Sequence, residues 1–148
     1  MKNTLFLDID GVLHPMSATC IDFVDGRMEV TGEELFRWAP LLWELIEPYP
    51  VTIAIHGSWR HCYRLDEVLR NFPEAMQARI AGMTAGAGRY ESIQLWLEHY
   101  PVTRFAVLDD MPAAFPTNWP HLIVCHPERG IADQTVQERL RKFLSYCT

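Results

Sequence analysis

Short apolar runs that end in polar residues recur along the chain and predict buried β-strands. The first run covers residues 4–8, where Thr-Leu-Phe-Leu leads into Asp8. Continuous rather than alternating apolar runs of this length are typical of strands that are buried on both faces. The same pattern predicts further strands at 51–55, 105–108 and 122–125, and a short edge strand within 78–83.

Apolar residues at helical spacing separate these runs. Thr31 and Glu34 have the spacing of a capping box, which predicts a helix that starts there and ends before Pro48. Similar stripes predict helices over 62–72, over about ten residues from Arg89 to Pro101, and over 133–146. Because strands and helices alternate, the predicted fold class is α/β: a three-layer, Rossmann-like domain whose mainly parallel sheet is covered by helices on both faces.

Residues 20–30 interrupt this alternation. Asp25 and Gly26 lie between two short apolar runs, which is the turn chemistry of a two-residue β-hairpin. We see no linker, repeat or low-complexity segment elsewhere in the 148 residues, a length that suits one domain with its own core. We therefore expect a single domain over 1–148 that carries one small hairpin.

Composition and charge exclude several classes of protein. Hydrophobic residues make up 49% and charged residues 22%, as in an ordinary globular domain, and a net charge of -6 argues against an extended nucleic-acid footprint. The four cysteines form no C-x-x-C pair, which argues against a zinc ribbon or a redox motif. Asp8 comes too early for a signal peptide, and acidic residues and prolines interrupt the apolar region 38–55, so we expect a cytoplasmic protein with no membrane partner.

Candidate chemistry gathers where the predicted strands end, because ligands of α/β sheets bind at the carboxyl ends of the strands. The polar residues at these ends are Asp8, Asp10, Ser58, Asp109 and Asp110. Like charges about 4 Å apart repel by roughly 4 kcal/mol at an effective dielectric near 20, so clustered carboxylates need a cation or a raised pKa. Ligands that are all oxygen atoms favour Mg2+. Gly11 would let the backbone approach a ligand.

These residues resemble a known pattern. The stretch Leu-Phe-Leu-Asp8-Ile-Asp10-Gly11-Val-Leu is similar to the first motif of the haloacid dehalogenase-like (HAD) hydrolases. The strand that ends at Ser58 resembles the second motif. Arg89 stands where the third motif has Lys or Arg, and Asp109-Asp110 resembles the acidic fourth motif. The hairpin lies where HAD proteins place their flap, so the resemblance spans essentially the whole chain.

A narrower resemblance concerns a small bacterial HAD group whose members also occur as domains of multifunctional RNA-repair proteins. It rests on Ser58-Trp59-Arg60, on the helix that follows Arg89, on Leu-Asp-Asp, and on the terminal Pro-x-x-Gly-Ile over 127–131. With only a hairpin and one helix between the first two long strands, we expect a domain with no separate cap. An open site of this kind would admit bulky phosphorylated substrates, including nucleic-acid ends.

The resemblance implies a Mg2+-dependent phosphatase. Asp8 would attack phosphorus and form an aspartyl-phosphate, while Asp10 would act as general acid and then as general base. Mg2+ would be held by the Asp8 carboxylate, the Asp10 carbonyl and the fourth-motif acids, with Asp110 as the direct ligand and Asp109 behind it.

The phosphoryl group would be bound by Ser58, by Arg89 and by the backbone at Gly11. Arg60 and Arg64 compete with Arg89 for the role of the positive charge. Trp59 would either stack on a substrate ring or pack in the core.

Other functional classes also cluster acidic residues at strand ends. A metal-dependent nuclease does so, although it does not call for Ser58 and Arg89. A non-catalytic phosphate-binding or interaction module would retain the site without turnover. A phosphate receiver domain would want its phosphorylated Asp at a middle strand and a Lys at a late one, which this chain does not offer. Substrate identity and oligomeric state stay open.

Overall fold

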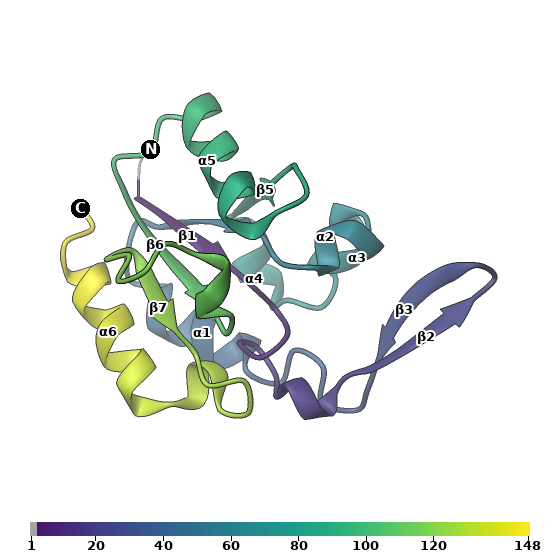
Figure 1. Cartoon of the computed structure of the whole chain (residues 1–148). Coiled ribbons are helices and arrows are strands. Elements are labelled where there is room, and N and C mark those ends of the chain that lie inside the picture. The colour runs from purple at the N-terminus through teal and green to yellow at the C-terminus, as the bar shows by residue number, and fades with distance from the viewer. Residues whose placement is uncertain (1–2) are drawn as a thin grey trace.

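A parallel five-stranded sheet forms the centre of the protein (Figure 1). The computed structural model describes residues 3–148, so residues 1 and 2 of the predicted domain lie outside the described part. In spatial order the strands are β5 (Ile80–Met83), β4 (Thr52–Ile55), β1 (Asn3–Leu7), β6 (Arg104–Asp109) and β7 (Leu122–Val124). All four neighbouring pairs are parallel, so the predicted α/β class and parallel sheet are confirmed.

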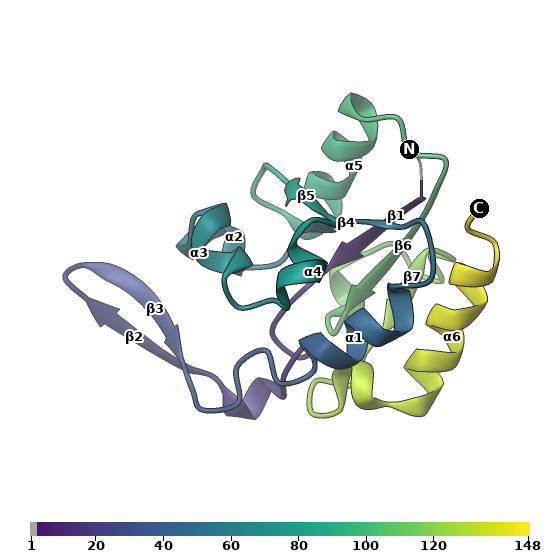
Figure 2. The ribbon, with the colours of Figure 1, turned by 180° about the vertical axis from the view of Figure 1, so that it is seen from behind.

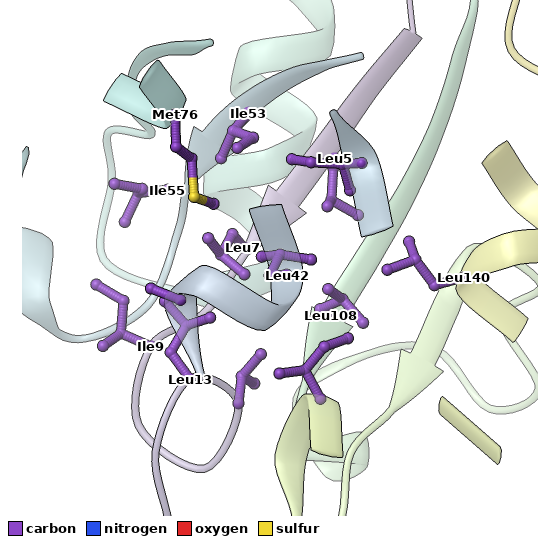
Figure 3. Close-up of a cluster of buried hydrophobic side chains, with 14 of the residues drawn as sticks. Leu5, Leu7, Ile9, Leu13, Leu42, Ile53, Ile55, Met76, Leu108 and Leu140 are labelled. Carbon is purple, nitrogen blue, oxygen red and sulfur yellow. The ribbon is translucent and has the colours of Figure 1, made fainter. Parts of the chain in front are cut away.

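The two faces of the sheet bury two separate hydrophobic clusters. Leu5 and Leu7 of β1 point into the larger cluster, which Figure 3 shows together with Leu42 and Leu140. Phe6 points to the opposite face, into the smaller cluster. Alternate residues of a strand point to opposite faces, and each fully buried Leu or Phe stabilises the fold by roughly 1.5–3 kcal/mol. The apolar runs of the sequence are therefore strands that are covered on both sides.

Helices cover both faces of the sheet. On the side of the larger cluster lie α1 (Ala39–Ile46), which is in front of the sheet in Figure 2, and α6 (Gln134–Ser145), which is at the right of that view. On the other face lies α5 (Arg89–His99), together with the segment before β7. Both α5 and α6 agree with the predicted helices. Within residues 3–148, none of the helices is long and apolar enough to cross a membrane.

The helix predicted to begin at Thr31 is wrong at its start, because α1 begins only at Ala39. Thr31 is instead the last residue of a strand, and the intervening segment contains Phe36 with a left-handed φ of 61°. The Trp38 amide donates to the Leu13 carbonyl at 2.8 Å, which ties this segment to the loop after β1. A tertiary contact thus replaces the first turns of the expected helix.

The helix predicted over 62–72 is divided into shorter elements. Arg64 has an extended backbone between α2 (Trp59–Cys62) and α3 (Leu65–Leu69), and its amide donates to the Glu67 carboxylate at 2.9 Å. The remaining short elements are α4 (Glu74–Gln77) and the 3-10 turns η1 (Met16–Ala18), η2 (Pro112–Ala114) and η3 (Gly130–Ala132).

The predicted hairpin is present and projects from the body of the molecule in both views (Figures 1 and 2). It consists of the antiparallel strands β2 (Cys20–Val24) and β3 (Arg27–Thr31), and both turn residues have positive φ. Side chains along β3 tie the hairpin to the segment 62–67: Arg27, directly after the turn, pairs with Glu67 at 2.8 Å, and the Val30 amide donates to the Tyr63 hydroxyl at 2.8 Å. Phe23 of the outer strand is 75% exposed.

Candidate active site

The register of the three central strands places Asp8, His56 and Asp109 in one row. The residues two positions earlier are paired with one another across β4, β1 and β6, and they are Ala54, Phe6 and Val107. Because side chains alternate with a period of two, the next residues of the same rows also lie side by side on the face that α5 covers. All three are fully buried. The row brings two of the predicted acids together and adds His56, which was not among the predicted site residues.

Three carboxylates converge at this end of the sheet. Asp8, Asp109 and Asp110 each offer an oxygen atom, and these atoms lie within 4.8 Å of one another. Two glycines make the convergence possible: a side chain at Gly11 would collide with the Asp110 carboxylate, and one at Gly57 would collide with Asp8 Oδ1. Gly11 also has a φ of 77°, which disfavours other residues.

Arg89, the first residue of α5, supplies positive charge to this cluster. Its Nη1 atom lies 2.9 Å from Asp8 Oδ2 and 2.8 Å from Asp109 Oδ2. His56 Nε2 lies 2.7 Å from the same Asp109 oxygen, and the Met111 amide donates to the other at 2.8 Å. The Asp109 carboxylate is therefore fully engaged by protein groups.

Burial and neighbouring charges shift the pKa values of the three acids in different directions. Burial raises the pKa of Asp8 well above its ordinary value, and the neighbouring Asp109 carboxylate raises it further against the opposing effect of Arg89. Burial, and then Asp109, also raise the pKa of Asp110. Burial opposes ionisation of Asp109 too, but hydrogen bonds from His56 and the charge of Arg89 outweigh it and lower its pKa. Burial lowers the pKa of His56.

Asp10 lies beside this cluster rather than in it. Its Oδ1 atom is 2.7 Å from His14 Nε2 and accepts a hydrogen bond from Trp59 Nε1 at 2.8 Å. Trp59 is only 4% exposed and stacks on Tyr63, so packing, and not exposure to a substrate ring, describes its position. No sequence pattern indicates the His14 contact. The proximity of Trp59 to Ser58 was the only hint of its place near the site.

The other predicted phosphate-binding residues occupy different positions. Ser58 precedes α2 and is half-buried, and its side chain does not cap that helix. Arg60 donates to backbone carbonyls of the loop before Arg89, namely those of Thr84, Gly86, Ala87 and Gly88. Arg64 is exposed and pairs with Asp66 at 3.1 Å. The Gly11 amide donates to the His14 carbonyl at 3.0 Å, within its own loop.

The donor set suits a divalent cation such as Mg2+. Asp8 Oδ2 is buried and receives no hydrogen bond of normal geometry from residues 3–148, although Arg89 forms an ion pair with it. One Arg89 nitrogen is shared between Asp8 and Asp109, so it offsets only part of the charge of three clustered carboxylates, and buried carboxylate oxygens are costly until a further cation satisfies them. The carboxylate oxygens of Asp8 and Asp110 are hard ligands of the kind that Mg2+ prefers. The chain's own residues therefore fit this cofactor.

Comparison with known proteins agrees with this geometry. A family model described as the HAD domain in Swiss Army Knife RNA repair proteins matches residues 4–136, which include all the site residues described above. Neither the curated proteins nor the solved structures give a match. The family match covers most of the 148 residues and agrees with the order of the four motifs and with the parallel sheet. The chain therefore belongs to the family of HAD domains described from Swiss Army Knife RNA repair proteins and has the fold of a HAD hydrolase.

Proposed function

We propose that this protein is a Mg2+-dependent phosphomonoesterase that works through an aspartyl-phosphate on Asp8. The convergence of Asp8, Asp109 and Asp110 within 4.8 Å, with Arg89 at 2.9 Å from Asp8, carries the proposal. A structural ion pair would need one acid and one base, whereas this cluster has an excess of buried negative charge. Such an excess is the arrangement that a cation and a phosphoryl group complete.

Asp8 is the nucleophile in this proposal. The Ile9 amide donates to Asp8 Oδ1 at 2.8 Å and fixes the orientation of the carboxylate. A carboxylate oxygen forms a bond to phosphorus while the bond from phosphorus to the leaving oxygen breaks, and Asp10 gives that oxygen its proton. In the second step water attacks the phosphorus, Asp10 takes a proton from the water, and inorganic phosphate leaves Asp8.

Mg2+ would be held by Asp8, by the Asp10 carbonyl and by Asp110, and it would supply charge neutralisation for the phosphoryl oxygens. Since both Asp109 oxygens already accept hydrogen bonds or ion pairs, the geometry supports Asp110 as the direct ligand and Asp109 as the residue that orients Arg89 and His56.

The phosphoryl group would be bound by Arg89 and Ser58. Arg89 forms an ion pair with the proposed nucleophile Asp8 at 2.9 Å, and Gly57 brings the turn before Ser58 directly against Asp8. Arg60 acts indirectly, because its guanidinium holds the loop that leads into Arg89. The backbone at Gly11 contributes room for Asp110 in addition to any contact with phosphate.

The proposed substrates are terminal phosphates of RNA or of nucleotides. The family is named from RNA repair proteins, and we propose that residues 1–148 form one HAD-like domain without a separate cap. The segment between β1 and β4 consists of η1, the projecting hairpin and α1. The net charge of -6 favours recognition of a chain end over an extended footprint.

Release of inorganic phosphate from a panel of phosphomonoesters tests the proposal. The panel contains oligoribonucleotides with 5' or 3' phosphates, nucleotides and phosphosugars, each with Mg2+ or with EDTA. We expect turnover that requires Mg2+ and that is lost in Asp8→Asn but kept in the matched control Asp66→Asn, which changes an exposed acid.

Three results would contradict parts of this assignment. Cleavage of phosphodiesters without monoesters would indicate a nuclease. Binding of phosphate mimics by a folded protein without turnover on any substrate would indicate a binding module. Turnover of phosphosugars with intact oligonucleotides would refute the substrate class alone.

A further inference from the structure

We propose that His14 and Trp59 are positioning residues that hold one carboxylate oxygen of Asp10, so that only its other oxygen, Oδ2, exchanges a proton with the substrate. This inference rests on the proposed function, because it assigns the proton donor of that reaction to one atom. We refer to His14 and Trp59 together as the Asp10 clamp.

Both residues of the clamp contact the same oxygen. Trp59 Nε1 donates to Asp10 Oδ1 at 2.8 Å, and His14 Nε2 lies 2.7 Å from the same atom. An indole N–H is a donor in every protonation state of the protein, so this contact always favours Oδ1 as an acceptor. If the two buried groups merely needed partners, they would not have to converge on one atom. Convergence leaves Oδ2 as the oxygen available to carry the proton.

The backbone of Phe36 determines which nitrogen of His14 carries the proton. The Phe36 amide donates to His14 Nδ1 at 2.9 Å. A backbone amide has no acceptor capacity, so Nδ1 is unprotonated and the proton of the neutral ring is on Nε2. His14 is therefore a donor to Asp10 Oδ1, and it supports the contact that Trp59 makes.

The protein accepts an unusual backbone conformation at this point. Phe36 has a φ of 61°, which is a rare value for a bulky residue and is found mostly where the surrounding structure enforces it. Its ring packs edge-on against Trp59 at 5.1 Å and against His14 at 5.8 Å. One residue thus supplies the amide that sets the His14 tautomer and the ring that fills the space between the two parts of the clamp.

Burial makes these contacts selective. His14 is 0% exposed and Trp59 is 4% exposed, whereas the Asp10 side chain is 12% exposed. Water therefore does not compete for the donors of the clamp, while part of the Asp10 side chain stays accessible from solvent. Hydrogen bonds in such surroundings orient a side chain more strongly than the same bonds in solvent.

Dependence on the leaving group tests the clamp. Values of kcat/KM report the steps up to expulsion of the leaving group, and aryl leaving groups with a low pKa need little help from an acid, whereas alkyl leaving groups need much. We expect Trp59→Phe and His14→Leu to lower kcat/KM about tenfold or more on alkyl phosphates and less than about threefold on p-nitrophenyl phosphate. General acid catalysis is commonly worth 10²- to 10⁴-fold, so a partial loss of it is measurable. His14→Gln, which keeps a donor near the position of Nε2, should recover part of the loss.

Trp43→Phe is the matched control, because Trp43 packs against the same core and its ring lies under the Arg79 guanidinium, away from Asp10 and its hydrogen-bond donors. This variant should lower kcat/KM by the same factor on alkyl phosphates and on p-nitrophenyl phosphate, or should leave both values unchanged. If the Trp59 and His14 variants also lose the same factor on every leaving group, the clamp is only structural and the proposal is overturned.

A second measurement decides the clamp even if no phosphatase activity is found. In 15N NMR spectra of the wild type at pH 7, we expect His14 to be protonated on Nε2 and the Trp59 indole proton to exchange slowly. Asp10→Ala should shift the Trp59 indole signal and speed its exchange while the Trp96 signal stays in place. A His14 protonated on Nδ1, or a Trp59 indole signal that does not respond, would refute the clamp. Absence of turnover with these NMR results would instead refute the proposed function.

Discussion

Replacing Asp8 by asparagine is expected to stabilise the metal-free protein, although it removes the proposed nucleophile. Asp8 is fully buried, and its pKa is raised well above the ordinary value by burial and by the charge of Asp109. The ionised carboxylate therefore lowers the free energy of unfolding at neutral pH. Asparagine has nearly the same shape, and its amide oxygen can still accept the hydrogen bond that the Ile9 amide donates to Asp8 Oδ1.

The expected size of the effect follows from the distances. Two carboxylates 4.8 Å apart, the limit within which these oxygens lie, repel by about 3.5 kcal/mol at an effective dielectric of about 20. Arg89 at 2.9 Å attracts Asp8 by about 6 kcal/mol on the same scale. Repulsion from Asp109 and Asp110 together exceeds this attraction by about 1 kcal/mol, and burial of the charge adds to the penalty. We expect Asp8→Asn to raise the free energy of unfolding by about 1–3 kcal/mol at pH 7.

Urea denaturation in EDTA between pH 4.5 and 8 measures this difference. The folded-state pKa of Asp8 is raised, so between the unfolded and folded pKa values the folded protein binds more protons than the unfolded chain. The stability that this group contributes is thus present at low pH and is lost as the pH rises through that window. The difference in free energy of unfolding between Asp8→Asn and wild type should therefore grow with pH and then level off. Asp66→Asn is the exposed control and should leave the pH profile unchanged.

Mg2+ provides the second arm of the same experiment. A ligand that binds only the folded state stabilises it according to its concentration and affinity. Wild type should gain stability on addition of Mg2+, whereas Asp8→Asn should gain less, so the difference between the two proteins narrows or reverses. An Asp8→Asn protein that is less stable than wild type at pH 7 in EDTA, or an offset that is constant with pH, would refute the electrostatic reasoning.

Substitutions at three further residues separate the roles assigned above. Arg60→Met should speed amide hydrogen exchange over 84–89 and lower kcat, because the loop carbonyls lose their donor; unchanged exchange would contradict this role. His56→Leu should lower the free energy of unfolding in urea by about 1–3 kcal/mol, since Asp109 loses a buried donor, and His56→Gln should recover part of it. Ser58→Ala should change stability by less than about 0.5 kcal/mol, because the hydroxyl caps no helix, but should raise KM for phosphomonoesters; an unchanged KM would exclude Ser58 from the phosphate site.

The helices show how far local patterns extend. α6 was predicted closely, because Asp133 accepts a hydrogen bond from the Thr135 amide and an apolar stripe follows it. The predicted capping box at Thr31 failed, since the same residue types also suit the end of a hairpin strand. A cap motif reports only local preference, and the contact between Trp38 and Leu13 that displaced the helix joins segments 25 positions apart.

Some residues of the candidate site could likewise be predicted from the sequence, and others could not. Motif order was enough to single out Asp8, Asp10, Asp109 and Asp110, because these acids follow apolar runs whose carboxyl ends meet in a parallel sheet. It was not enough to rank Arg89 above Arg60 and Arg64. Only the fold directs Arg89 to Asp8, gives Arg60 to the loop before it, and leaves Arg64 in solvent with Asp66.

The sequence by itself therefore determined the α/β class, the strands, the projecting hairpin and the acids at the strand ends, because hydrophobic periodicity and turn chemistry act over a few residues. The tertiary structure alone decided which strands are neighbours, and with them the row of Asp8, His56 and Asp109. It also decided the partners of Asp10, since His14, Phe36 and Trp59 come from three separate segments. Hydrogen bonds between distant segments depend on strand register and on packing across the core, and a single sequence encodes these without displaying them.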